Sequence, residues 1–338
     1  MLRKTLNLLV SLLLTFIGLT LITFVIGRVM PVDPAAAIVG DRASNEAYEA
    51  KYHELGLDKS IIEQYWIYLT KTAEGDFGKS IMTANPVSED ILRFFPATLE
   101  IATMATILGT IIGTLLGVLA AINHGKWIDH AVRVGGLLGY SVPIFWLAMM
   151  ALLVFYAELD WVAGPGRIDI SYEGLVESYT GSIFIDAAWQ GQWEVFGNAF
   201  SHAILPVSIL TIYAIAYISR MTRSFMLEQL HQEYVLTARV KGLSERRVIW
   251  RHMFGNVLVQ LITVIGLIYA SLLEGSVLTE IIFSWPGIGQ YITHSLFNGD
   301  MNAVVGGTVV VGMCFIGINI FSDFLYRVVD PRVRGDKE

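Results

Sequence analysis

Residues 97–122 read ATLEIATMATILGTIIGTLLGVLAAI, and this stretch decides the fold class because Glu100 is its single charged residue. A helix needs about 20 predominantly apolar residues to cross the roughly 30 Å of hydrocarbon in a bilayer. Residues 97–122 meet this requirement, and so do the stretches 8–29, 134–159, 203–221, 257–282 and 303–328. The sequence therefore predicts an all-α polytopic membrane protein with six transmembrane helices.

The composition agrees with a membrane protein. Of the 338 residues, 54% are hydrophobic and 16% are charged, whereas a soluble domain has about 45–50% apolar and about 25% charged residues. The single cysteine, Cys314, excludes an intramolecular disulfide, and the net charge of −7 argues against nucleic acid as a partner. Arg3 and Lys4 precede the first stretch as they would in a signal peptide. We nevertheless expect an uncleaved anchor, because a signal peptide has an apolar core of only about 7–15 residues.

The distribution of Lys and Arg predicts the orientation. With the N-terminus in the cytoplasm, most of the 23 basic residues lie in cytoplasmic segments or at the helix ends beside them. The outer loop 160–201 has one basic residue, Arg167, and the outer loop 283–302 has none. Short cytoplasmic loops of membrane proteins are enriched in Lys and Arg. We therefore expect a multi-pass protein with both termini in the cytoplasm.

Two outer segments are long enough to fold outside the membrane. In 30–96, apolar and aromatic residues recur at helical spacing from Tyr52 to Leu69, which predicts one or two amphipathic helices at the outer face. The loop 160–201 is acidic and contains three tryptophans, Trp161, Trp189 and Trp193. It is either a solvated surface with tryptophans at the membrane interface or a docking surface.

No motif in the sequence supports catalysis. The segment 75–80 ends like a phosphate-binding loop, but Ala73 occupies the position of the first glycine that a Walker A motif requires. The sequence contains no HExxH zinc pair and no GxSxG nucleophile motif. We therefore expect no enzyme activity, no metal and no cofactor in this chain.

The longest cytoplasmic loop is 222–256, TRSFMLEQLHQEYVLTARVKGLSERRVIWRHMFGN. We expect two short helices broken at Gly242, because glycine accepts positive φ, and Ser244 is suited to cap the second helix. A loop of this length between spanning helices is expected to have structure or a function of its own. Its basic residues are either only determinants of orientation or part of an interaction surface.

Motifs along the whole chain resemble, in collinear order, the permease subunits of binding-protein-dependent ABC importers. The strongest is EYVLTARVKGLS at 233–244, and the supporting motifs are ATLE at 97–100, YSVPIFW at 140–146, HAILP at 202–206, RMTR at 220–223, TEIIFSWPGIG at 279–289 and DPR at 330–332. The chain is most similar to the dipeptide, oligopeptide and nickel permease family. It departs from the family pattern at two places. An acidic residue and an alanine are common where this chain has Leu236 and Thr237, and a proline is common where it has Gln260.

The resemblance implies the type I ABC importer permease fold and the uptake of short peptides or similar small solutes across the bacterial inner membrane. Permeases for nickel chelates, glutathione and antimicrobial peptides share this pattern, so they remain alternatives. A secondary transporter is less favoured, because the sequence shows neither clear internal repeats nor ion-coupling carboxylates. Residues 1–96 would form an anchor with an outer-face helical region, and residues 97–330 the permease domain with the coupling loop 222–256.

The resemblance also implies partners and a docking site. The partners would be a second homologous permease, one or two ABC ATPase subunits that bind ATP and Mg, an outer-face substrate-binding protein and membrane lipid. In such importers the cytoplasmic loop docks in a groove of the ATPase. Carried over to this chain, the ATPase-docking residues would be Glu233, Thr237, Ala238, Lys241, Gly242 and Arg246.

Two spanning stretches have a polar helical face. In 97–122 this face contains Thr103, Thr106, Thr110, Thr114 and Gly117, and it is expected to pack against another helix. In 257–282 the face contains Thr263, Leu267, Ala270, Ser271 and Glu274. A carboxylate within a span costs about 2.5–3.5 kcal/mol on insertion scales unless it meets water or a partner. Glu274, with Ser271 and Thr263, is therefore either part of the translocation pathway or hydrated near the outer interface.

Overall fold

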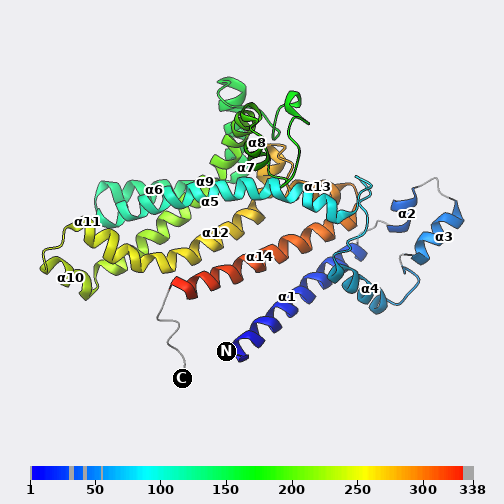
Figure 1. Cartoon of the computed structure of the whole chain (residues 1–338), viewed down its shortest axis with the longest axis horizontal. Helices are drawn as coiled ribbons and strands as arrows, with labels where there is room; N and C mark the ends of the chain where they lie inside the picture. Colours follow the sequence, from blue (N-terminus) through cyan, green and yellow to red (C-terminus); the bar gives the residue numbers. More distant parts are fainter. Residues whose placement is uncertain (1, 30–33, 41–43, 55, 330–338) are drawn as a thin grey trace. The chain divides into compact units, whose positions relative to one another are not determined.

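The computed structural model describes residues 2–29, 34–40, 44–54 and 56–329. Among these residues the regular elements are helices, apart from a single β-bridge between Lys79 and Pro86, and Figure 1 shows the helices in chain order. The chain divides into two compact units, Met1–Ala97 with Pro286–Ile316 and Thr98–Trp285 with Gly317–Glu338. The DPR motif at 330–332 lies outside the described residues.

The first unit contains α1 (Leu2–Val29), α2 (Pro34–Val39), α3 (Asn45–Glu54), α4 (Ile61–Glu74), the start of α5 (Val87–Ile122), α13 (Ile288–Phe297) and the first half of α14 (Met301–Val329). The second unit contains the remainder of α5 and the second half of α14. It also contains α6 (Trp127–Ser141), α7 (Ile144–Ala151), the π-helix η1 (Leu152–Glu158), the 3-10 turn η2 (Ile170–Tyr172), α8 (Ile183–Trp189), α9 (Trp193–Leu230), α10 (Glu233–Val240), α11 (Glu245–Arg247), the π-helix η3 (Val248–Met253) and α12 (Phe254–Ile282).

The all-α prediction is confirmed, and all six predicted spans fall on helices. They coincide with α1, α5, the pair of α6 with α7 and η1, α9, α12 and α14. Within the described residues, four helices are long and apolar enough to cross a membrane, or five if the bent pair is one span. The apolar part of α1, Leu13–Ile26, is shorter than these.

The third predicted span, 134–159, is wrong as a continuous helix. Its two halves are bent by 95° at the break between Ser141 and Ile144. Pro143 causes the break, because proline has no N–H to donate and disfavours the helical conformation in the residue before it. Val142 accordingly is extended, with φ −75° and ψ 126°.

Two other helices begin earlier than predicted. α5 begins at Val87 and α9 at Trp193, about ten residues before the apolar stretches themselves start. Hydropathy marks the apolar part of a spanning helix and does not mark where the helix itself begins.

The prediction of an amphipathic helix between Tyr52 and Leu69 is confirmed in part by α4, which begins at Ile61. Ser60 and Glu63 form a capping box at its start, and Gly75 ends it with φ 81°. α4 packs on α1 through two tyrosine hydroxyls: Tyr65 hydrogen-bonds Thr20 at 3.1 Å and Tyr68 hydrogen-bonds Thr23 at 3.0 Å. These pairs satisfy the two threonine hydroxyls, both of which are buried.

Buried carboxylates hold the loop between α4 and α5. Asp300 accepts hydrogen bonds from the Ser80 hydroxyl and from the backbone N–H of Ile81, so Ser80 has a structural role. Asp90 accepts from the Tyr291 hydroxyl at 3.0 Å. Burial, and then the charge of Asp90, raises the pKa of Tyr291, so this hydroxyl stays protonated and keeps donating across the neutral pH range.

In the second unit, α5 packs closely on α9 through glycines spaced four residues apart. A Cβ atom at Gly117 would lie 2.7 Å from the carbonyl oxygen of Ser219, and one at Gly113 would lie 3.0 Å from the Cβ of Ile218. Small residues allow helices in a membrane to approach this closely. The predicted packing face is confirmed at the buried Thr106 and Thr114, whereas Thr103 is exposed and hydrogen-bonds Tyr269 at 3.0 Å.

Candidate functional site

The segment that joins α9 to α12 contains the short helix α10, and its side chains divide sharply into buried and exposed. Val235 and Ala238 are buried, whereas Leu236 and Val240 are 64% and 79% exposed. Figure 1 shows this segment beyond the ends of α9 and α12. We call residues 233–247 the connecting segment.

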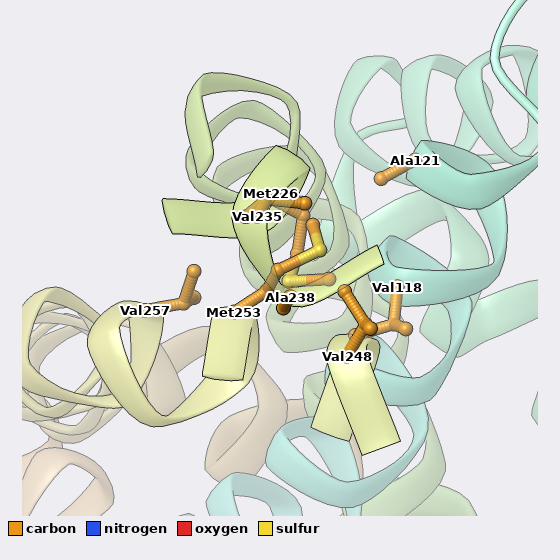
Figure 2. Close-up of a cluster of buried hydrophobic side chains, with 8 residues drawn as sticks. All are labelled: Val118, Ala121, Met226, Val235, Ala238, Val248, Met253 and Val257. Atoms are coloured by element: carbon orange, nitrogen blue, oxygen red, sulfur yellow. The ribbon is translucent and has the colours of Figure 1, made fainter. Parts of the chain in front are cut away.

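A cluster of buried apolar side chains anchors the connecting segment, and Figure 2 shows its members. Val235 and Ala238 of α10 are packed with residues from the ends of three long helices and from η3: Val118, Ala121, Met226, Val248, Met253 and Val257. Burying one such aliphatic side chain contributes about 1.5–3 kcal/mol relative to leaving it exposed. The cluster therefore ties α10 to α5, α9 and α12 as one packed body.

The turn after α10 has the predicted break at Gly242. Its φ is +75°, in the left-handed region that favours glycine. Arg239 donates two hydrogen bonds to Glu245 across the turn, at 2.8 and 3.1 Å, which is the paired geometry that suits arginine and carboxylate. Ser244 is the N-cap residue of α11, as predicted, although its hydroxyl makes no capping hydrogen bond.

The structure places the predicted docking residues in two environments. Exposed are Glu233, Thr237, Lys241, Gly242 and Arg246. Ala238 is buried in the cluster, so its part is to hold α10 in place. The predicted docking residues do not include Leu236 and Val240. Their spacing of four residues places them on one face of a helix, and Val235 and Ala238 lie on another face, so the pattern was available in the sequence. An exposed apolar pair on a short helix suits insertion into a partner's groove.

The fifth predicted span, α12, has two carboxylates in opposite environments. Glu280 is fully buried and accepts hydrogen bonds from Thr98 at 2.7 Å and from Ser276 at 2.9 Å. Glu274 is exposed and makes no hydrogen bond or ion pair within the described part of the chain. Its charge therefore faces whatever lies outside this chain.

Only part of the predicted face of α12 surrounds Glu274. Ser271 and Leu267 are exposed beside it, and Thr263 is half-buried. Ala270, which helical spacing placed on the same face, is buried. The exposed stripe of α12 thus consists of Leu267, Ser271, Glu274 and Leu278.

The loop between η1 and α9 is held by a buried ion pair. Arg167 donates to Glu100 at 2.8 Å, and Glu100 also accepts from the Ser182 hydroxyl at 2.7 Å. In the sequence, Arg167 is the single basic residue of the loop 160–201, and Glu100 is the single charged residue of the stretch 97–122. This was the available signal for their pairing. The fixed loop leaves Trp161, Ile170 and Trp189 exposed.

Replacing Arg167 by glutamine should destabilise this loop. Removing one partner of a buried pair leaves an uncompensated charge and costs about 3–5 kcal/mol. We expect faster limited proteolysis within 160–182 and a lower thermal unfolding midpoint for Arg167→Gln. The control is Lys51→Gln, which removes an exposed pair with Glu54 and should leave the midpoint unchanged. Equal effects of the two variants would contradict a structural role for the buried pair.

Comparison with known proteins agrees with these features. Residues 113–335 match the family described as "Binding-protein-dependent transport system inner membrane component", and residues 1–102 match the N-terminal part described for such membrane components. The fold is similar to a chain of the MetNI methionine ABC transporter in an inward-facing conformation, with a TM-score of 0.53, 18% sequence identity, and coverage of 71% of this chain and 96% of that chain.

Several relatives match over nearly the whole chain. The di/tripeptide transport system permease protein DppB of Pseudomonas aeruginosa is 40% identical over 321 residues, covering 95% of each chain. The dipeptide transport system permease protein DppB of Escherichia coli is 40% identical over 325 residues, covering 96% of each. The probable D,D-dipeptide transport system permease protein DdpB of Escherichia coli is also 40% identical, covering 97% of this chain and 96% of the relative. The chain therefore belongs to the inner membrane component family of binding-protein-dependent transport systems.

Proposed function

We propose that this protein is the transmembrane permease subunit of an ATP-driven ABC importer that translocates short peptides across the bacterial inner membrane. The observation that carries the proposal is the anchored α10 with Leu236 and Val240 exposed, in a chain 40% identical over most of its length to dipeptide permeases. Uptake of nickel chelates, glutathione or antimicrobial peptides would use the same geometry, so transport assays must decide among these substrates.

In this proposal the chemistry of ATP hydrolysis belongs to partner subunits. One or two ABC ATPases bind ATP and Mg, a second homologous permease completes the membrane pathway, and a substrate-binding protein delivers the solute to the outer face. The exposed aromatic residues of 160–201, with the helices of 30–96, provide the surface for the binding protein. This chain contributes the pathway wall and the ATPase contact.

The packing of α10 suggests how ATPase movement reaches the membrane. Leu236 and Val240 insert into the ATPase, and Val235 and Ala238 sit on the opposite side in the cluster with Met226 and Met253. Packed interiors are dense and transmit displacement instead of absorbing it. A shift of the ATPase surface therefore moves the ends of α9 and α12 together with α10.

Reconstitution tests the proposed function. The chain is purified with its partner permease, ATPases and binding protein, placed in proteoliposomes, and supplied with a radiolabelled dipeptide. We expect uptake that requires ATP and the binding protein and that persists when ionophores collapse the proton and sodium gradients. Uptake driven by an ion gradient without ATP would contradict the proposal and favour a secondary transporter.

The proposed orientation predicts which residues an impermeant reagent reaches. In a Cys314→Ser background, a maleimide added outside intact cells or spheroplasts should label Asp76→Cys and not Ser244→Cys. Both positions are exposed in the structure, so accessibility of the side chain itself does not differ. Permeabilised cells provide the control, because both positions should then react. Labelling of Ser244→Cys alone from outside would reverse the topology.

We further propose that Glu274, with Ser271 and Thr263, lines the translocation pathway and attracts the positively charged end of the substrate. Two unit charges about 4 Å apart attract by about 1 kcal/mol even in bulk water, and by more where the dielectric constant is lower. Glu274→Gln should therefore weaken uptake of peptides with a free amino terminus or a basic side chain about fivefold or more. It should change uptake of N-acetylated peptides with neutral side chains much less. Competition assays with both peptide classes measure the difference.

The competing role for Glu274 is a salt bridge to the partner permease. In that case Glu274→Gln would reduce assembly of the complex, or lower uptake of all substrates equally. Co-purification of the partner permease with the variant separates the two roles. Glu228→Gln is a suitable control, because it makes the same change at an exposed carboxylate of another helix, α9.

A further inference from the structure

A cavity of about 360 Å³ lies between α6 and α9, within the second unit. Its polar lining comes from His130, Arg133, Tyr140, Ser219, Arg220 and Arg223. Pockets that hold small ligands have volumes of about 300–1,000 Å³. The cavity is therefore large enough for a small polar group, and its lining indicates a negatively charged one.

The charges around this cavity do not cancel. The single carboxylate of α6, Asp129, is already bound by Arg223 at 2.5 and 2.8 Å. Arg133 and Arg220 are exposed, and neither forms an ion pair within the described residues. Two guanidinium groups thus remain available to an anion.

Arg220 is held in position without a carboxylate. Its guanidinium lies over the rings of Tyr140 and Tyr217, at 5.7 and 5.2 Å from their centroids. Such contacts orient an arginine while leaving its donors free. Arg220 is accordingly oriented in advance, which lowers the entropy that ligand binding would cost.

The depth of the cavity and the apolar surface beside it identify the source of the anion. Arg133 directly precedes the apolar run of α6 that begins at Val134, and Arg220 is one residue from the end of the apolar stretch 203–221. In the proposed orientation these are cytoplasmic ends of apolar runs, so we place both arginines near the headgroups of the inner leaflet. Val134 and Leu137 line the cavity and are exposed, and Leu138 continues this apolar surface along α6. A free phosphate ion would leave this surface uncovered, whereas the acyl chains of a lipid would cover it.

We propose that this cavity binds the phosphate of an anionic glycerophospholipid such as phosphatidylglycerol. Arg133 and Arg220 bind the phosphate oxygens, and the acyl chains lie along Val134, Leu137 and Leu138. Basic pockets between spanning helices are known sites for anionic lipid headgroups. In the proposed orientation the lipid belongs to the inner leaflet and links α6 to α9 beside the cluster that anchors α10.

Lipid titration of the purified complex tests this site. The whole transporter complex is delipidated in a neutral detergent and titrated with phosphatidylglycerol or phosphatidylcholine of the same acyl chains, and bound lipids are counted by native mass spectrometry. We expect phosphatidylglycerol to bind at least tenfold more tightly than phosphatidylcholine. Arg133→Gln should weaken phosphatidylglycerol binding about fivefold, and the additional change Arg220→Gln about fivefold more.

The controls separate this site from general surface charge. Arg247→Gln removes an exposed cation that does not line the cavity, so it should leave the affinity unchanged. Arg133 is exposed and unpaired in the described residues, so Arg133→Gln keeps the test valid if Arg220→Gln disturbs folding. Equal affinity for the two lipids, or equal effects of Arg133→Gln and Arg247→Gln, would overturn the proposal.

Two further results would assign the cavity to another occupant. Displacement of phosphatidylglycerol by millimolar inorganic phosphate would show a site for free anions. A crosslink from Leu137→Cys, in a Cys314→Ser background, to the partner permease would show that a subunit covers this face. Either result would contradict a lipid site, and we expect neither.

Discussion

A Gly242→Val complex should lose at least about nine-tenths of its ATP-driven transport and of its substrate-stimulated ATP hydrolysis, while the chain still inserts and assembles. Gly242 has φ +75°, and a Cβ atom at this position would meet nothing within 4 Å. The penalty for valine therefore comes from the backbone, at about 1–2 kcal/mol for a side chain in the left-handed region and more for a β-branched one. We expect the backbone of the turn to change its dihedral angles to relieve this strain. This change would displace Leu236 and Val240 from their contact with the ATPase.

The matched control for this effect is Gly242→Asn. Asparagine tolerates the left-handed conformation better than other non-glycine residues, so this variant should keep most of the activity. The measurement compares uptake and ATP hydrolysis of the two variants at equal amounts of assembled complex. Normal transport by Gly242→Val, or equal loss in both variants, would contradict the role assigned to this turn.

The second large effect is expected at Gly117, one of the glycines through which α5 packs closely on α9. A single added methyl group would place Cβ 2.7 Å from the carbonyl oxygen of Ser219 and 2.6 Å from the Cβ of Thr222. Overpacking of this kind costs about 1–3 kcal/mol, because backbone must move. Gly117→Ala should lower the thermal unfolding midpoint of the detergent-solubilised protein, and Gly117→Leu should prevent stable assembly.

Gly197 in α9 provides the matched control for Gly117. It is an exposed helical glycine, and a Cβ atom at this position would meet nothing within 4 Å. Alanine there should be neutral or stabilising by about 0.5–1 kcal/mol, because alanine favours the helix. If Gly117→Ala were as stable as Gly197→Ala, the close approach of α5 and α9 would be wrong.

The sequence predicted the spans because crossing a bilayer imposes a length and an apolar composition that can be read locally. The extensions of α5 to Val87 and of α9 to Trp193 were missed, since hydropathy locates the apolar part of a helix and does not mark the residue at which the helix begins. The break at Pro143 had a visible local cause. The 95° bend itself was not predictable, because proline is often accommodated in membrane helices by their neighbours.

The break at Gly242 was predictable, because it depends on the backbone conformation of a single residue. The burial and pairing of side chains were not predictable, because they depend on residues far away in the sequence. Ala238 is buried because Met226, Met253 and Val257 from other helices pack in the same cluster. The pairing of Arg167 with Glu100 likewise joins residues 67 positions apart, and no pattern along the chain specifies that contact.

A photocrosslink from α10 tests directly whether this helix contacts the ATPase subunit. p-Benzoylphenylalanine is introduced at Leu236, which is exposed on α10, or at Trp189, which is 83% exposed in the outer loop. After irradiation of the assembled transporter, adducts are identified by mass spectrometry. We predict an adduct between position 236 and the ATPase subunit, and none between position 189 and that subunit. An ATPase adduct from position 189, with none from position 236, would contradict the assignment of α10 as the ATPase contact.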